Sequence, residues 1–234
     1  MVERRQFDIA IVGAGIAGSA LAVALSGSGL TIALVEAQPL VRRDLPVGVG
    51  LTDFDARVSA LTPRSRALLE RLDAWEAIAA YRQCAYRHMA VWDAEGTGSI
   101  DFDCSELNVA ALGHIVENRA IVSALLQRVE AAGDINCIAP DRVLACTREE
   151  AGGMNLSLDS GLELHAGLVV GADGALSRIR QLMGFATREW DYGHRAIVCT
   201  AQVASPHQAT AWQRFLPSGP LAFLPLPGGP DRHF

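Results

Sequence analysis

The most constraining feature of the chain is a glycine-rich turn close to its N-terminus. Phe7–Val12 is an apolar, strand-like run, and the turn Gly13-Ala-Gly-Ile-Ala-Gly18 follows it directly. Residues 16–25 are rich in helix formers, and a second apolar run, Thr31–Val35, ends at the acidic Glu36. A strand, a G-x-G-x-x-G turn, a helix, a strand and an acid together form the fingerprint of a βαβ unit that binds an adenine dinucleotide.

Each glycine of this fingerprint has a physical role. Gly13 is expected to make the tight turn, Gly15 to let the backbone approach a pyrophosphate, and Gly18 to let the helix pack close to the strand. The pyrophosphate would meet the backbone of the turn, Ala14 included, and the N–H groups at the start of the helix. Glu36 would accept hydrogen bonds from a ribose 2′-OH. The fingerprint alone does not separate FAD from NAD, since both are adenine dinucleotides.

Composition narrows the class of protein. The chain has 234 residues, of which 50% are hydrophobic and 20% charged, and a net charge of −6, which argues against nucleic acid as a partner. No apolar run is long enough to span a membrane, and no secretory leader pattern is present. The five cysteines and six histidines show neither C-x-x-C nor other metal-ligand spacing. We therefore expect a cytoplasmic protein with reduced thiols and no metal.

The segments after the βαβ unit contain a long loop and two helices. Residues 39–56 are expected to form the loop, and a loop of this length in a compact domain is usually functional. Thr62 and Pro63 predict a helix start, with Thr62 as its cap. A second helix is predicted over 119–131, with Asn118 as its cap. An apolar stripe at helical spacing is expected in the core: Leu68, Leu69, Leu72, Trp75 and Ile78.

Alternating apolar and polar residues predict a second, mostly β region, formed by a hairpin at 86–92 and 99–103 and by further strands within 195–215 and 221–226. An antiparallel meander is expected at 142–148, 154–158 and 162–165, before the chain returns to the nucleotide sheet at 167–170. The prediction is an α/β fold in which a Rossmann-like nucleotide domain (1–85 and 105–188) is interrupted by a mostly antiparallel β substrate domain (86–104 and 189–234).

A second glycine–acid motif lies at Val169–Arg180. Asp173, between glycines 171 and 174, could accept hydrogen bonds from ribose or ribityl hydroxyls while the glycines let a cofactor pass close. Read alone, the same residues also fit an Asx turn that caps a short helix.

Several segments together resemble a known family. Gly13–Gly18, Asp55–Leu61 and Gly171–Arg180 resemble the flavoprotein aromatic hydroxylases related to para-hydroxybenzoate hydroxylase, whose FAD domain is of the GR2 type. Within these, the chain is similar to the ubiquinone-biosynthesis (Ubi) hydroxylases, and to the UbiI-like group in particular. The segments that carry this closer resemblance are Met89–Asp93, Leu112–Asn118, Trp190–Tyr192 and Gly219–Pro225. The resemblance spans essentially all 234 residues.

The resemblance implies a cofactor, a reaction and a set of binding residues. It implies FAD, reduced by NAD(P)H, and the hydroxylation by O₂ of the aromatic ring of a polyprenylated phenol. No catalytic side chain follows from it, because the cofactor carries the chemistry. The residues that the resemblance assigns to the cofactor are Gly13, Ala14, Gly15 and Gly18 at the pyrophosphate, Glu36 at the ribose, Arg57 near the pyrophosphate and ribityl chain, the backbone of Val143 at the adenine, and Asp173 in the motif shared by FAD and the nicotinamide.

One family motif is absent from the chain, and several points of function stay open. The family's Gly-Asp-Ala-Ala-His motif, which packs on the ribityl chain and flavin ring, has no counterpart, so we expect an N-terminal portion that is inactive alone. An NAD(P)-dependent dehydrogenase and a non-catalytic flavin-binding or assembly module stay open as alternatives. An association with a quinone-biosynthesis complex, or with the inner membrane surface, also stays open. His114 and Tyr192 are either pocket residues or structural ones.

Overall fold

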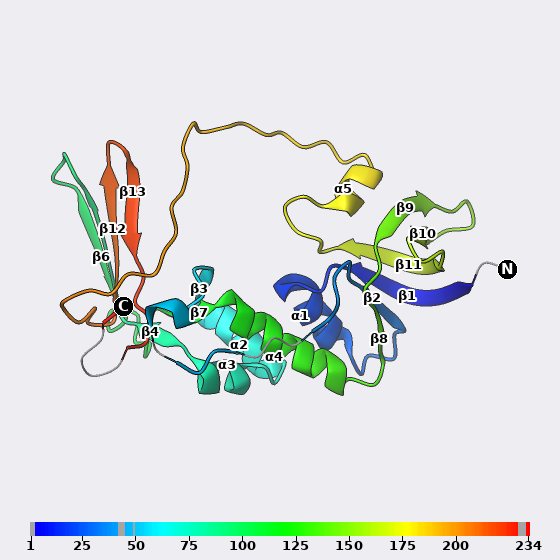
Figure 1. Cartoon of the computed structure of the whole chain (residues 1–234), viewed down its shortest axis with the longest axis horizontal. Helices are drawn as coiled ribbons and strands as arrows, with labels where there is room; N and C mark the ends of the chain where they lie inside the picture. Colours follow the sequence, from blue (N-terminus) through cyan, green and yellow to red (C-terminus); the bar gives the residue numbers. More distant parts are fainter. Residues whose placement is uncertain (1–2, 42–44, 49, 229–232) are drawn as a thin grey trace. The chain divides into compact units, whose positions relative to one another are not determined.

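The computed structural model describes residues 3–41, 45–48, 50–228 and 233–234. The chain divides into two compact units (Figure 1). Unit 1 comprises Met1–Arg43 and Val122–Glu189, and unit 2 comprises Asp44–Ile121 and Trp190–Phe234. Each unit has its own sheets and core, and each is described by itself.

Unit 1 is built on a six-stranded sheet with the strand order β8-β2-β1-β11-β10-β9. The first four strands in this order run parallel, and β9, β10 and β11 form an antiparallel meander. The strands of the sheet are β1 (Arg4–Val12), β2 (Ile32–Val35), β8 (Ile135–Ile138), β9 (Val143–Arg148), β10 (Met154–Leu158) and β11 (Glu163–Gly171).

Strand β2 and the end of β1 are buried on both faces, which explains their continuous apolar sequence. Ile32 and Leu34 of β2 pack with helices α1 (Ile16–Leu25) and α4 (Asn118–Ala131), whereas Ala33 and Val35 pack with the meander and α5 (Arg178–Leu182). Figure 1 shows α1 and α4 on one side of the parallel strands, and β9, β10 and α5 on the other. The carboxyl ends of β1, β2 and β11 therefore meet at one edge, where ligands bind in such sheets.

Unit 2 contains a four-stranded sheet, β13-β12-β5-β6, and a three-stranded sheet, β3-β7-β4. In the larger sheet β12 runs parallel to β5, while its other pairs are antiparallel. Its strands are β5 (His88–Asp93), β6 (Ser99–Asp103), β12 (Thr210–Leu216) and β13 (Gly219–Phe223); those of the smaller sheet are β3 (Val58–Leu61), β4 (Cys84–Tyr86) and β7 (Gly113–Glu117). The helices of this unit are α2 (Pro63–Arg71) and α3 (Trp75–Tyr81).

Most of the predicted elements are present. The βαβ start, the hairpin of β5 and β6 and the meander are confirmed, and Thr62 caps α2 by accepting a hydrogen bond from the Ser65 amide at 3.2 Å. The apolar stripe is interrupted at Asp73, whose φ of 52° ends α2 before α3 begins. All of the stripe is buried except Leu68, which is 39% exposed. The predicted loop at 39–56 contains one 3₁₀ turn, Leu51–Asp53, and residues 42–44 and 49 lie outside the described ones.

Three predictions on local structure are wrong. The last strand of the meander and the return to the nucleotide sheet are a single strand, β11, because its first half pairs with β10 and its whole length pairs with β1. Regular strand within 195–215 begins only at Thr210, since the residues before it form no ladder apart from a bridge at Val203. Asn118 is itself the first residue of α4, and its side-chain oxygen accepts a hydrogen bond from Ser59 Oγ at 2.6 Å.

The two compact units are also not divided where the nucleotide and substrate domains were predicted. Residues 44–85 and 105–121 belong to the same compact unit as 86–104. The reason is that β3, β4 and β7 pair with one another and not with the six-stranded sheet. The functional division into a nucleotide domain and a substrate domain stays a prediction.

Candidate functional site

The glycine turn after β1 is packed too tightly for any other residue at two of its positions. Gly13 has a φ of +103°, and its amide donates to Val35 O at 2.8 Å. A Cβ at Gly13 would lie 2.4 Å from Ala172 O, and one at Gly18 would lie 1.8 Å from Gly13 O. The turn therefore has the tight geometry and the close helix approach that the fingerprint predicts.

Gly15 is different, because the space beside it is open. A Cβ at Gly15 would meet no atom within 4 Å, and the residue has an ordinary φ of −71°. It is the N-cap of α1, which has no side-chain cap, so the first N–H groups of the helix lack an intrahelical partner. An uncapped helix start with open space in front of it fits an anionic group such as a pyrophosphate.

Two side chains hold the turn in this shape. Ser19, fully buried on α1, donates from Oγ to Ala14 O at 2.9 Å. Glu36 accepts from the Ala14 amide through Oε2 at 2.8 Å and from the Gln38 amide through Oε1 at 2.9 Å. A carboxylate has about four acceptor positions, so Glu36 keeps capacity for ribose hydroxyls. Ser19 was missed by the sequence reasoning; its signal is a polar residue on an otherwise apolar helix face.

The second glycine–acid motif lies directly against the first. The Ala172 amide donates to Val12 O at 2.7 Å, and a Cβ at Gly13 would come within 2.9 Å of the Asp173 Cα. The structure thus brings together two motifs separated by about 160 residues of sequence. They share the edge of the sheet at which β1 and β11 end.

The carboxylate of Asp173 is used by its own segment. It accepts from Ser177 Oγ at 2.6 Å, from the Arg178 amide at 2.6 Å and from the Ile179 amide at 3.1 Å. Burial alone would raise the pKa of Asp173, but these hydrogen bonds outweigh it and the pKa is lowered. Asp173 therefore binds the first N–H groups of α5, whose N-cap residue is Ser177. These amides lie five and six residues after Asp173, so the contact supports the helix start without being an Asx turn, and the predicted contact of Asp173 with a cofactor stays a prediction.

Val143 and Arg57 lie in different units. The Val143 side chain is buried in the core of unit 1, two residues after Asp141, whose amide donates to Glu36 O at 2.8 Å. The start of β9 is thus linked to the end of β2. Arg57 is exposed in unit 2, where its carbonyl accepts from the Asn118 amide at 2.9 Å and its amide donates to Asp55 Oδ1 at 3.0 Å. The predicted contacts of both residues with FAD stay predictions.

Unit 2 contains an apolar cavity of about 570 Å³. One wall is the face of the larger sheet that carries Trp212, Leu221 and Phe223, and another is formed by Asp55 and Ala56 beside Arg57. Trp212 also packs edge-on against Trp92, with ring centroids 6.0 Å apart. The sequence reasoning did not identify this cavity; its signal is the alternation of large apolar residues along β12 and β13.

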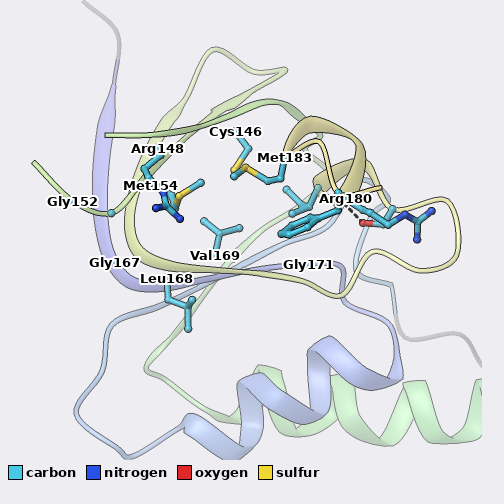
Figure 2. A pocket seen from close by; sticks show the side chains of 14 residues that line it. Cys146, Arg148, Gly152, Met154, Gly167, Leu168, Val169, Gly171, Arg180 and Met183 are labelled. Carbon is cyan, nitrogen blue, oxygen red and sulfur yellow. Dashed lines mark hydrogen bonds between the residues drawn. The ribbon is translucent and has the colours of Figure 1, made fainter. Parts of the chain in front are cut away.

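A second cavity, of about 550 Å³, lies in unit 1 between the meander and α5. Figure 2 shows Met154, Val169 and Met183 pointing into it, with Arg148 and Arg180 at opposite ends. None of the residues predicted to bind the cofactor lines this cavity.

The sequence left the roles of His114 and Tyr192 open, and the structure shows an aromatic contact for each. His114 is buried, with Nε2 3.3 Å from Arg66 Nη1 and its ring edge-on to Trp75. Burial and the nearby Arg66 cation lower the pKa of His114. Tyr192 is 75% exposed, and its ring lies 6.2 Å from that of Trp190. Neither residue lines the apolar cavity of unit 2, so both fit the structural alternative.

In 3–41, 45–48, 50–228 and 233–234, no group of three His, Cys, Asp or Glu side chains is arranged to hold a metal ion. No helix of this part of the chain is long and apolar enough to cross a membrane. All five cysteines are free.

The parallel sheet, the glycine turn and the acid at the end of β2 define a dinucleotide-binding α/β protein. Residues 6–227 match the family described as "FAD binding domain", and the chain belongs to this family. FAD, which the resemblance implied and the fingerprint alone left open, is therefore the cofactor class of the family.

The relatives identify a branch of flavoproteins. The chain is 36% identical over 222 residues to 3-demethoxyubiquinol 3-hydroxylase of Escherichia coli, covering 94% of this chain and 54% of that protein. It is 34% identical over 233 residues to the human mitochondrial ubiquinone biosynthesis monooxygenase COQ6, covering 94% and 48%. The chain thus spans about half the length of the curated relatives it matches. Similarity to the ubiquinone-biosynthesis hydroxylases is confirmed, and the UbiI-like assignment stays a prediction.

Solved structures support the fold. The Pseudomonas aeruginosa protein PqsL in complex with 2-aminobenzoylacetate has a TM-score of 0.74 at 20% identity, covering 98% of this chain and 59% of that one. A ternary complex of aklavinone-11 hydroxylase with FAD and aklavinone has a TM-score of 0.61 at 19% identity, covering 97% and 44%. At these identities the likeness concerns the fold.

Proposed function

We propose that the protein is an FAD-dependent monooxygenase of ubiquinone biosynthesis that hydroxylates the aromatic ring of a polyprenylated phenol, with NAD(P)H as electron donor. The observation that carries the proposal is the open, uncapped helix start at Gly15, inside a turn whose other two glycines have no room for a side chain. The ubiquinone-biosynthesis relatives support the choice of reaction.

The turn and the residues around it would hold the adenine half of FAD. The N–H groups of Gly15 and of the first turn of α1 would face the pyrophosphate, because the amides of Gly13 and Ala14 already donate to Val35 O and Glu36. Glu36 would accept from the ribose with the lone pairs that Ala14 and Gln38 leave free. Val143 and Asp173 would lie along the same edge, and Arg57 would supply a cation to the pyrophosphate and ribityl chain. When bound, FAD supplies the redox chemistry that activates O₂.

The apolar cavity of unit 2 would take the substrate. Its wall of Trp212, Leu221 and Phe223 is suited to an aromatic ring or a prenyl chain, whose burial is favourable by about 25 cal/mol per Å² of apolar surface. The protein would exclude water and orient the ring, and the overall reaction would be ArH + O₂ + NAD(P)H + H⁺ → ArOH + H₂O + NAD(P)⁺.

The apolar character of the substrate also indicates where in the cell the protein would act. A polyprenylated phenol partitions into a bilayer, so the proposal places a cytoplasmic protein at the inner membrane surface during turnover. An association with other proteins of quinone biosynthesis would also bring the protein to this substrate.

The test is to supply the protein with FAD, NADH or NADPH, ¹⁸O₂ and a prenylated phenol, and to search for product by mass spectrometry. A product with one ¹⁸O atom in a new ring hydroxyl group would support the proposal, if it forms in step with nicotinamide oxidation and does not form with Gly15→Val. Nicotinamide-dependent oxidation of a substrate alcohol without ¹⁸O in the product would show a dehydrogenase. Tight FAD binding without any turnover would favour a flavin-binding module.

A further inference from the structure

A buried cluster of three charged side chains lies at the end of β7 in unit 2. Glu117 is 3% exposed; its Oε1 lies 2.8 Å from Arg82 Nη2, and its Oε2 lies 2.5 Å from Arg119 Nη2. The Arg82 side chain is 8% exposed and that of Arg119 is 22% exposed. Taking such charges out of water is costly, and a well-packed apolar set of similar volume is often as stable. Stability alone is therefore a weak reason for this cluster.

The cluster holds the loop that precedes β3. Arg82 donates to Gly48 O at 2.5 Å and to Asp53 O at 2.8 Å, and Arg119 also donates to Asp53 O. The Asp55 amide donates to Glu117 Oε2 at 2.7 Å. These contacts attach the loop through charged side chains where it has no strand ladder.

Aromatic contacts add to this attachment. The Arg82 guanidinium lies 4.5 Å from the centroid of the Phe54 ring and 4.5 Å from that of Tyr81. The ring of Phe54, a loop residue, is buried with Ile115 of β7. Arg82 is therefore fixed in one position, and the loop carbonyls that it binds are fixed with it.

Arg57 follows this loop directly. Val58 pairs with Glu117 in the ladder of β3 and β7, and the Asn118 amide donates to Arg57 O at 2.9 Å. Asp55, whose amide binds Glu117, also lines the apolar cavity. We infer that Glu117, with Arg82 and Arg119, is a positioning cluster that holds residues 53–57 in the conformation in which Arg57 binds FAD. The inference rests on the proposed function.

The test separates positioning from stability. Glu117→Leu/Arg82→Met replaces the two most buried charges by apolar groups of similar size and leaves only Arg119, which is 22% exposed and can be hydrated, so we expect Tm to stay within a few degrees. The Asp55 amide should exchange its hydrogen at least roughly ten-fold faster, since its acceptor is gone. The Kd for FAD should rise roughly ten- to a hundred-fold, the loss of one charge-assisted hydrogen bond.

A double-mutant cycle shows whether the cluster acts through Arg57. Arg57→Ala alone should raise the Kd for FAD to a similar extent, and adding Arg57→Ala to Glu117→Leu/Arg82→Met should raise it little further. Effects that add fully would overturn the inference. An unchanged exchange rate of the Asp55 amide in Glu117→Leu/Arg82→Met would also overturn it, as would faster exchange with an unchanged Kd for FAD.

Two single variants keep the test decisive if the double variant does not fold. Glu117→Gln keeps the shape of the side chain and removes the counter-charge of Arg82 and Arg119; it should change exchange and FAD affinity in the same direction. Glu70→Gln is the matched control, because Glu70 binds Arg66 Nε at 2.8 Å but is 44% exposed and should change neither. Equal effects of both variants would contradict the inference. A wild-type protein that binds no FAD would overturn the proposed function, and exchange at Asp55 would still show whether the cluster holds the loop.

Discussion

Replacing Gly15 by alanine should separate cofactor binding from folding. A Cβ at this position would meet no protein atom within 4 Å, and the φ of −71° and ψ of −170° suit an L-residue. Replacing glycine by alanine at such a compatible site stabilises a protein by about 0.4–1 kcal/mol, because the unfolded chain loses conformational freedom. Gly15 is also the N-cap of α1, where glycine is preferred to alanine, and this opposes the gain, so the free energy of unfolding should stay within about 1 kcal/mol of wild type.

FAD affinity should fall much more than stability changes. The added methyl group would lie in the open space in front of α1, where the pyrophosphate is proposed to approach the backbone. Loss of one or two hydrogen bonds to a charged group costs about 1.5–3 kcal/mol each, so the Kd for FAD should rise at least roughly ten-fold. Urea unfolding measures the stability, and quenching of flavin fluorescence measures the Kd. An unchanged Kd in a stable Gly15→Ala protein would refute the placement of the pyrophosphate at this turn.

Three further predictions follow from the packing and the pKa shifts. Gly18→Ala should lower the free energy of unfolding by at least about 1–3 kcal/mol in urea titrations, because its Cβ would lie 1.8 Å from Gly13 O; a stability equal to wild type would contradict the packing described. Because the pKa of His114 is lowered by burial and by Arg66, the unfolded chain takes up this proton more readily, so stability should fall as the pH drops from about 6.5 towards the lowered pKa. His114→Gln should flatten this part of the stability profile, and an identical profile would count against it. Burial raises the pKa of Cys84 to about 11, whereas Cys199 is exposed, so iodoacetamide should label Cys199 first, as mass spectrometry of the peptides would show; labelling in the reverse order would be inconsistent with this burial.

The parts of the fold that could be predicted are those specified by short stretches of sequence. The turn Gly13–Gly18 and the acid Glu36 predict one another at fixed spacing, and Thr62-Pro63 marks a helix start by local chemistry alone. The apolar run of β2 predicts a strand buried on both faces. In each case the residues that determine the structure lie close together in sequence, at most within one βαβ unit.

The parts that could not be predicted depend on contacts distant in sequence. Nothing local indicates that Ala172 packs on Gly13. Glu117 and Arg82 are separated by 35 residues, and each would pass for a surface charge in its own segment. Alternation within 195–215 predicted strand where the structure has a ladder only from Thr210, because alternation does not show that a pairing partner is available.

The central claim is that the protein binds FAD through the turn at Gly13–Gly18. Titration of ¹⁵N-labelled protein with FAD, followed by amide NMR, tests it most directly. We expect saturable shifts with one FAD per chain, largest at the amides of Gly15 and of the first turn of α1 and also present at Glu36. Binding of FAD that leaves these amides unmoved, or no saturable binding at all, would contradict it.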